Sequence, residues 1–154
     1  MAEAGLTHGG FYRHFDTKEA LVGEAIRAAF DRFTETIEQR AATVGHEQAV
    51  KDFLDFYLSN DHLTHPGMGC PAPSLGADVG RAPEALKAEF AAGLHRTFAA
   101  LAKGLPGDEA TNRAAATREF ALRVGAILLA RASDPATAAD ILEACREPRE
   151  GATR

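Results

Sequence analysis

The chain has 154 residues, of which 45% are hydrophobic and 25% charged, as in a soluble globular domain with its own core. A formal net charge of -5 excludes nucleic-acid binding through overall charge, so such binding needs a local basic site. No apolar run reaches the roughly twenty residues of a membrane span, and the first residues lack the basic and apolar regions of a signal peptide. Two cysteines are too few for a disulfide framework. These observations favour a cytoplasmic protein without a membrane partner.

The chain opens with a short predicted helix over residues 7–15. Thr7 suits its N-cap, because a threonine side chain can accept a hydrogen bond from the first turn. Leu6, Phe11 and Phe15 fall on one side of this helix and need an apolar surface to pack against. Its exposed face, continued into the next helix, carries groups that suit phosphate and groove contacts: Thr7, His8, Tyr12, Arg13, His14 and Lys18.

A long amphipathic helix is expected over about residues 17–42. Its apolar residues recur every three or four positions along one stripe: Val22, Ile26, Phe30, Phe33 and Ile37. Asp16 is the expected N-cap, with Glu19 as its capping-box partner. Gly45 follows the expected end of the helix.

The next segments alternate between helical periodicity and breaks. A helix is expected over about residues 46–60. Glycine and proline are so dense over residues 62–83 that irregular structure is expected there, apart from a short helix around 74–79. Pro83 suits the first position of a further helix, whose apolar residues continue to Leu101.

Two more helices are expected, over about residues 108–132 and 135–145. Asp134 is a suitable N-cap for the second of them, and residues 147–154 are expected to form a frayed tail. No stretch alternates polar and β-branched residues as a strand would. The sequence therefore predicts an all-α chain of about six or seven helices.

Three groups of side chains could carry chemistry in the middle of the chain. His62, His65 and Cys70 have donor types that bind metals, but their spacing favours an ordinary pair of loop histidines, and no metal is expected. Cys70 could sense an electrophile or an oxidant if its pKa were lowered, whereas a small buried residue is the favoured interpretation. Cys145 lies on an apolar helix face and is expected to pack there. The aromatic residues are expected to be core, some of them also lining a ligand pocket together with Cys70: Phe53, Phe56, Tyr57, Phe90 and Phe98.

Nothing in the sequence indicates catalysis or a cofactor. There is no paired-carboxylate site and no arrangement of nucleophile, base and orienting group. The pattern Glu-x-x-His of di-iron helical bundles is also missing.

The start of the chain resembles the tetracycline-repressor (TetR) family of transcriptional regulators. Three runs carry the resemblance: Ala4-Gly5-Leu6-Thr7, Phe11-Tyr12-Arg13-His14-Phe15 and Thr17-Lys18-Glu19-Ala20-Leu21. The family implies a helix-turn-helix, a long connector helix and a helical body that binds an effector and dimerises. The division implied here is a remnant of the DNA-binding domain over residues 1–16, followed by the connector and effector-binding domain over residues 17–154.

The resemblance also implies roles for individual residues. Residues 7–15 correspond to the recognition helix, which places His8, Gly9 and Gly10 near base edges and Thr7 close to phosphate. Side chains at the family's backbone-contacting positions are Tyr12, His14 and Lys18, and Arg13 could supplement the base contacts. The family further implies a homodimer on a palindromic operator, joined through the helices over 108–132 and 135–145.

The family's first helix and most of its second would precede Ala4, so the expectation is an N-terminally truncated regulator. The favoured function is that of a DNA-binding, ligand-responsive repressor. The alternative is a dimerisation and ligand-binding module that does not bind DNA. A third class, a small helical enzyme or binding protein, would need a pocket with perturbed titratable groups.

Overall fold

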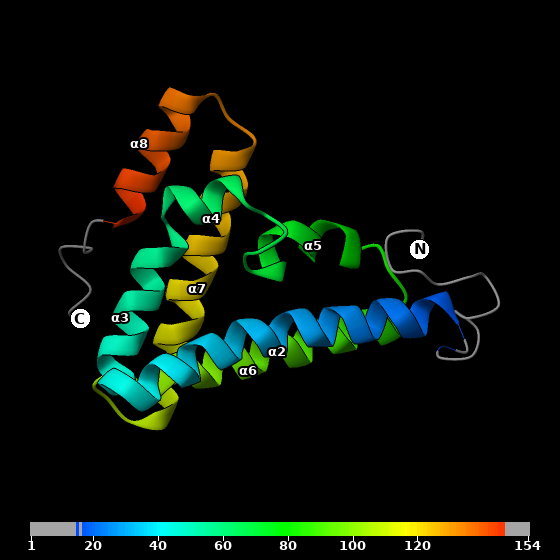
Figure 1. Cartoon of the computed structure of the whole chain (residues 1–154), viewed down its shortest axis with the longest axis horizontal. Helices are drawn as coiled ribbons and strands as arrows, with labels where there is room; N and C mark the ends of the chain where they lie inside the picture. The colour runs from blue at the N-terminus through cyan, green and yellow to red at the C-terminus, as the bar shows by residue number, and fades with distance from the viewer. Residues whose placement is uncertain (1–14, 16, 147–154) are drawn as a thin grey trace.

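The computed structural model describes Phe15 and residues 17–146, which form seven helices and no strand (Figure 1). The prediction of an all-α fold is confirmed for this part of the chain. Most of the predicted helix over 7–15, its Thr7 cap and the predicted tail over 147–154 lie outside the described residues. None of the described helices combines the length and the apolar character needed to cross a bilayer.

The longest helix, α2 (Lys18–Val44), matches the predicted connector helix closely. Four of the five residues of the predicted stripe are buried in the core, namely Ile26, Phe30, Phe33 and Ile37, and Val22 is partly buried against it. The helix ends at Gly45, whose φ of 85° is a conformation that residues with a side chain rarely adopt.

The predicted N-cap of this helix was wrong by one residue. Thr17, not Asp16, is the N-cap, and its hydroxyl accepts a hydrogen bond from the backbone nitrogen of Ala20 at 3.0 Å. Both residue types cap helices well, so the sequence alone does not separate them. The extended backbone of Thr17, with φ -142° and ψ 162°, decides the position.

The α2 helix runs parallel to and alongside α6 (Glu84–Ala102), and the two form the long arm of the molecule (Figure 1). Gly93 allows this close approach, because a Cβ atom built there would lie 2.3 Å from the Phe30 ring. Ion pairs join the flanks of the two helices at Arg27–Glu89 (2.6 Å) and Asp31–Arg96 (2.9 Å). Lys103, the C-cap residue of α6, pairs with Glu38 at 2.8 Å.

The middle of the chain is more helical than the sequence predicted. The predicted helix over 46–60 divides into α3 (His46–Tyr57) and the short α4 (Asn60–Thr64). The glycine- and proline-rich stretch contains α5 (Pro71–Val79), which begins three residues earlier than expected. Pro71 occupies the first turn of α5, where its missing N–H costs nothing.

The end of the chain forms α7 (Glu109–Arg131) and α8 (Pro135–Arg146). The predicted Asp134 cap is confirmed, since its carboxylate accepts from the backbone nitrogens of Ala136 and Thr137 at 3.0 and 3.1 Å. Pro83 is the N-cap of α6, one position before the predicted one.

Candidate functional site

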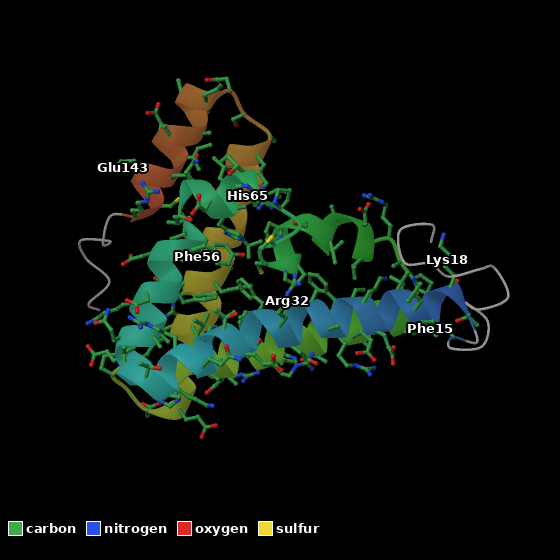
Figure 2. All side chains as sticks on the ribbon, viewed as in Figure 1. Phe15, Lys18, Arg32, Phe56, His65 and Glu143 are labelled. Atoms are coloured by element: carbon green, nitrogen blue, oxygen red, sulfur yellow. The ribbon has the colours of Figure 1, made fainter. Side chains whose placement is uncertain are left out.

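The free end of α2 carries the one predicted DNA-contacting residue that the structure describes. Thr7, His8, Gly9, Gly10, Tyr12, Arg13 and His14 lie outside the described residues. Lys18 is exposed in the first turn, and no carboxylate among the described residues forms an ion pair with it. Figure 2 shows Phe15 and Lys18 together at this end of the long arm. A helix N-terminus with an exposed cation attracts phosphate, since its N–H groups, its dipole and the cation all favour an anion.

The predicted ligand-lining aromatic residues divide into two groups. Phe53 and Tyr57 are buried among other rings, with Phe33–Phe53 and Tyr57–Phe120 centroids 5.1 and 5.6 Å apart. Phe90 and Phe98 are partly buried and make edge contacts with Phe30 and Phe120, at 5.2 and 5.7 Å respectively. Phe56 alone faces outward, with 46% of its surface exposed. The structure thus connects most of these residues within one aromatic core and places Phe56 at the surface.

The end of α3, α4 and the turn after it enclose a surface pocket, here called the Phe56 pocket. Its volume is 410 Å³, and its lining residues are Phe56, Asp61, His62, His65, Met68 and Gly69. Figure 2 labels Phe56 and His65, which reach it from α3 and from the end of α4. Met68 is 81% exposed, so the pocket combines an exposed apolar border with a carboxylate and imidazole groups. Pockets of this size and mixed lining bind small organic molecules.

His62 joins the three short elements around the Phe56 pocket. Its Nδ1 lies 2.7 Å from the carbonyl oxygen of Tyr57, and its Nε2 lies 3.0 Å from the backbone nitrogen of Cys70. A carbonyl can only accept and an amide can only donate, so Nδ1 carries the proton and Nε2 accepts. Both ring nitrogens are therefore occupied by main-chain groups, which leaves neither for a metal ion. Among the described residues, no three His, Cys, Asp or Glu side chains gather in a way that could hold a metal.

The electrostatics around Cys70 argue against a reactive thiol. Burial raises the pKa of the Cys70 thiol to about 12. A thiol with such a pKa stays protonated at neutral pH and is a weak nucleophile. The Sγ atom accepts from the backbone nitrogen of Ala72 at 3.4 Å, so Cys70 caps α5 as well as filling the core. These contacts agree with the favoured interpretation of Cys70 as a buried structural residue.

Two structural anchors were missed by the sequence analysis. Arg131 on α7 donates from Nε to the carbonyl oxygen of Leu63 at 3.0 Å and from Nη2 to that of His62, which ties α4 to α7. Asn112 donates from Nδ2 to three carbonyl oxygens in the turn between α6 and α7, those of Ala102, Leu105 and Gly107. Neither residue carries a local sequence signal, because most of the atoms that they bind are main-chain carbonyl oxygens, which every residue type supplies.

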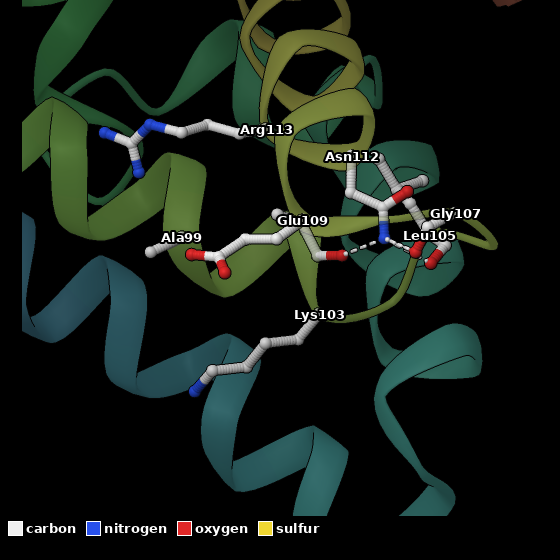
Figure 3. Close-up of a pocket in the computed structure, with 8 residues that line it drawn as sticks. Ala99, Lys103, Leu105, Gly107, Glu109, Asn112 and Arg113 are labelled. Atoms are coloured by element: carbon white, nitrogen blue, oxygen red, sulfur yellow. Dashed lines mark hydrogen bonds between the residues drawn. The ribbon is translucent and has the colours of Figure 1, made fainter.

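The Asn112 anchor closes one side of a second pocket, shown in Figure 3. This pocket has a volume of 490 Å³, and its charged lining residues are Lys103, Glu109 and Arg113. Lys103 already pairs with Glu38, and Arg113 hydrogen-bonds to His95 at 3.1 Å. Both cationic side chains of this pocket therefore already interact with other residues of the chain.

The family comparison concerns the start of the chain. Residues 1–25 match the family model described as "Bacterial regulatory proteins, tetR family". The start of this chain is thus similar to the start of TetR-family regulators. A comparison with curated proteins finds no match. The matched segment extends through the first turns of α2 and includes Lys18. The match therefore indicates a similarity of this segment to bacterial regulatory proteins of the TetR family.

The helical body that follows the matched segment exposes apolar surface on α7. Leu128 and Leu129 on α7 are 48% and 57% exposed. Gly125, one turn earlier, has open space where a Cβ would stand. This outward face of α7 is here called the Leu128 face, and such a patch of apolar and small residues suits close packing of another helix.

Proposed function

We propose that this chain is a DNA-binding transcriptional repressor that acts as a homodimer on a palindromic operator in the cytoplasm. The observation that carries the proposal is the family match over residues 1–25, which includes Lys18. The exposed Lys18 side chain at the N-terminus of α2 supports a phosphate contact. Because the net charge of the whole chain is negative, DNA binding needs a local basic contact, and Lys18 supplies one.

The roles proposed within the matched segment follow the family pattern. His8, Gly9 and Gly10 lie against base edges in the major groove, where the glycines permit close approach and His8 supplies a polar side chain. Thr7, Tyr12, His14 and Lys18 contact the phosphate backbone, and Arg13 adds to base contacts or to charge.

The Leu128 face supports the homodimer. Two copies of α7 and α8 packed through this face would bury Leu128 and Leu129 in both chains, which favours association by the hydrophobic effect. A two-fold dimer presents two copies of the start segment and therefore requires an operator with two-fold symmetry.

The Phe56 pocket supports response to a small-molecule effector. Its volume and lining suit a small organic molecule, and it lies on the same helical body as the 27-residue α2. An effector that binds one dimer geometry better than the other would shift the population between them. A changed tilt of α2 would then alter the spacing of the two start segments and release DNA.

Selection from a pool of random DNA duplexes tests this function. The purified full chain is expected to enrich a palindromic sequence with two half-sites about one helical turn apart. A gel-shift titration with the enriched duplex should then give two chains per duplex. If no sequence is enriched above the level of unrelated DNA, the DNA-binding function is rejected.

The same purified chain distinguishes the alternative, a dimerisation and ligand-binding module without DNA binding. The exposed Leu128 face favours dimerisation in either case. A stable dimer that enriches no duplex would support this alternative.

A further inference from the structure

The pocket beside the turn between α6 and α7, here called the Glu109 pocket, carries charges of both signs next to apolar surface. Its volume of 490 Å³ is that of a small-molecule site. Figure 3 shows the Glu109 carboxylate between the side chains of Arg113 and Lys103. Ala102 and Leu105 contribute apolar surface to the same pocket. A ligand in this pocket therefore meets ionic and apolar groups side by side.

The charge of Arg113 is not balanced by its one hydrogen-bond partner. Its Nη2 lies 3.1 Å from Nδ1 of His95. A guanidinium can only donate, so this Nδ1 accepts, and the imidazole is in a neutral form. No carboxylate among the described residues forms an ion pair with Arg113. Lys103 differs, because Glu38 balances its charge at a distance of 2.8 Å.

Glu109 and Arg113 also leave unformed a contact that their spacing favours. A glutamate faces an arginine four residues later on the surface of a helix, and such pairs stabilise the helix. Here the hydrogen bond to His95 holds Arg113 toward α6 instead. Within the described part of the chain, Glu109 has no cationic partner either. One carboxylate and one guanidinium therefore line the same pocket without an ion pair between them.

We propose that the Glu109 pocket binds a free α-amino acid with an apolar side chain, of the size of leucine. The ammonium group of the ligand donates to the Glu109 carboxylate. The ligand carboxylate accepts from Arg113, whose guanidinium has five N–H donors and gives one of them to His95. The apolar side chain of the ligand lies against Ala102 and Leu105. Both ionic groups of an α-amino acid are attached to one carbon atom, so a single small molecule reaches two residues that are one helical turn apart.

The pattern of charges favours this class of ligand over a simple anion or a simple cation. An anion bound to Arg113 is repelled by the Glu109 carboxylate, and a cation bound to Glu109 is repelled by the guanidinium. A zwitterion avoids both repulsions, because each of its groups meets the opposite charge. The Glu109 pocket shares no lining residue with the Phe56 pocket, so this binding is separate from the proposed effector site.

Titration of the full chain with L-leucine, followed by amide NMR spectroscopy, tests the proposal. Saturable shifts are expected for the amides of residues 99–113. Isocaproate is leucine without its ammonium group, and isoamylamine is leucine without its carboxylate. Each should bind about tenfold or more weakly than leucine, because it loses one charge-assisted hydrogen bond. Glycine, which lacks the apolar side chain, should also bind about tenfold more weakly.

Two charge-removing variants locate the binding site. Glu109→Gln and Arg113→Gln should each weaken leucine binding about tenfold or more. The matched controls are Glu35→Gln and Arg118→Gln, which remove the same charges from exposed positions outside the pocket and should leave binding unchanged. The amide spectrum of each variant shows directly whether the chain is folded.

Three results would overturn the proposal. The first is the absence of saturable shifts with leucine. The second is equal affinity for isocaproate, which would show an anion site only. The third is an equal effect of the pocket variants and the control variants. The titration contains no DNA, so its outcome is independent of the proposed DNA-binding function.

Discussion

The Nε2 atom of His62 lies 3.0 Å from the backbone nitrogen of Cys70, and this one hydrogen bond joins the end of α4 to the start of α5. The opposite ring nitrogen is bound to the carbonyl oxygen of Tyr57. A neutral imidazole with the proton on Nδ1 satisfies both groups, whereas a protonated ring would present a second donor to an amide that is itself a donor.

Stability should therefore fall in mild acid because of His62. Burial, together with the positive charge of Arg131, holds the pKa of His62 below its usual value, against the opposing effect of its bond to Tyr57. As the pH falls below about 6.5, the unfolded chain takes up a proton on this residue before the folded chain does. The stabilisation is complete above that pH and is lost as the pH falls through the lower pKa of the folded state. Urea unfolding between pH 5 and pH 8 measures this decline.

His65→Ala is the matched control for the acid effect, because His65 is exposed in the same region. It should leave the decline unchanged, while His62→Leu should flatten it. The His62 variant should also lower the free energy of unfolding by about 1–3 kcal/mol at neutral pH, since the buried Cys70 amide loses its acceptor. An unchanged pH profile in His62→Leu would show that other groups cause the decline.

Gly93→Ala should destabilise the long arm of the molecule. The added Cβ would lie 2.3 Å from the Phe30 ring, so α2 and α6 must separate or the ring must move. Overpacking of this kind costs about 1–3 kcal/mol. Thermal or urea unfolding gives the difference.

Gly76→Ala serves as the comparison for Gly93→Ala. Its Cβ would meet the Phe90 ring at 3.7 Å, an ordinary contact distance. Alanine is also the better helix former, so this change should be neutral or stabilising by up to about 1 kcal/mol. Equal destabilisation by the two variants would mean that Gly93 does not set the helix spacing.

Asn112→Asp should destabilise the turn between α6 and α7 at least as much as Asn112→Ala. The amide nitrogen donates to three carbonyl oxygens, and a carboxylate at that place would bring only further acceptors toward them. A cost of about 1–3 kcal/mol is expected for the loss of these bonds. Urea unfolding of both variants, beside Asn60→Ala at an exposed site, tests the prediction. If Asn112→Asp is as stable as the unaltered chain, the anchoring role of Asn112 is contradicted.

The sequence predicted the parts of the fold that depend on local signals. The stripe from Ile26 to Ile37 and the Asp134 cap were both confirmed, because their residue types act within one helix. The helices α4 and α5 were underestimated, since dense glycine and proline normally interrupt regular structure. Here Pro71 starts a helix instead of breaking one, and Cys70 caps it.

The sequence predicted the contacts of the candidate site less well than it predicted the fold. The anchoring role of His62 depends on main-chain groups five and eight residues away, and that of Arg131 depends on main-chain groups of α4. No spacing rule detects such contacts. The ligand-lining prediction gathered aromatic residues by helical spacing alone. Spacing does not distinguish the buried Tyr57 from the exposed Phe56, which is only one position away.

Leu128→Glu should weaken self-association of the chain. A charge on the Leu128 face would be buried without a partner in the proposed dimer, so the dissociation constant should rise by about tenfold or more. Ala91→Glu places the same charge at an exposed site on α6 and should leave association unchanged. Sedimentation equilibrium measures both. A monomeric unaltered chain would contradict the dimer outright.

The salt dependence of DNA binding by Lys18→Ala tests the proposed function most directly. Each lost phosphate contact lowers the slope of log affinity against log salt by about 0.9, so a dimer should lose about 2 units. Lys51→Ala is the control, because it removes the same charge from an exposed site on α3. Fluorescence anisotropy with the enriched duplex between low and moderate salt gives both slopes. A reduced slope for Lys18→Ala alone is the predicted result, whereas equal slopes for the two variants would contradict the placement of DNA at the start of α2.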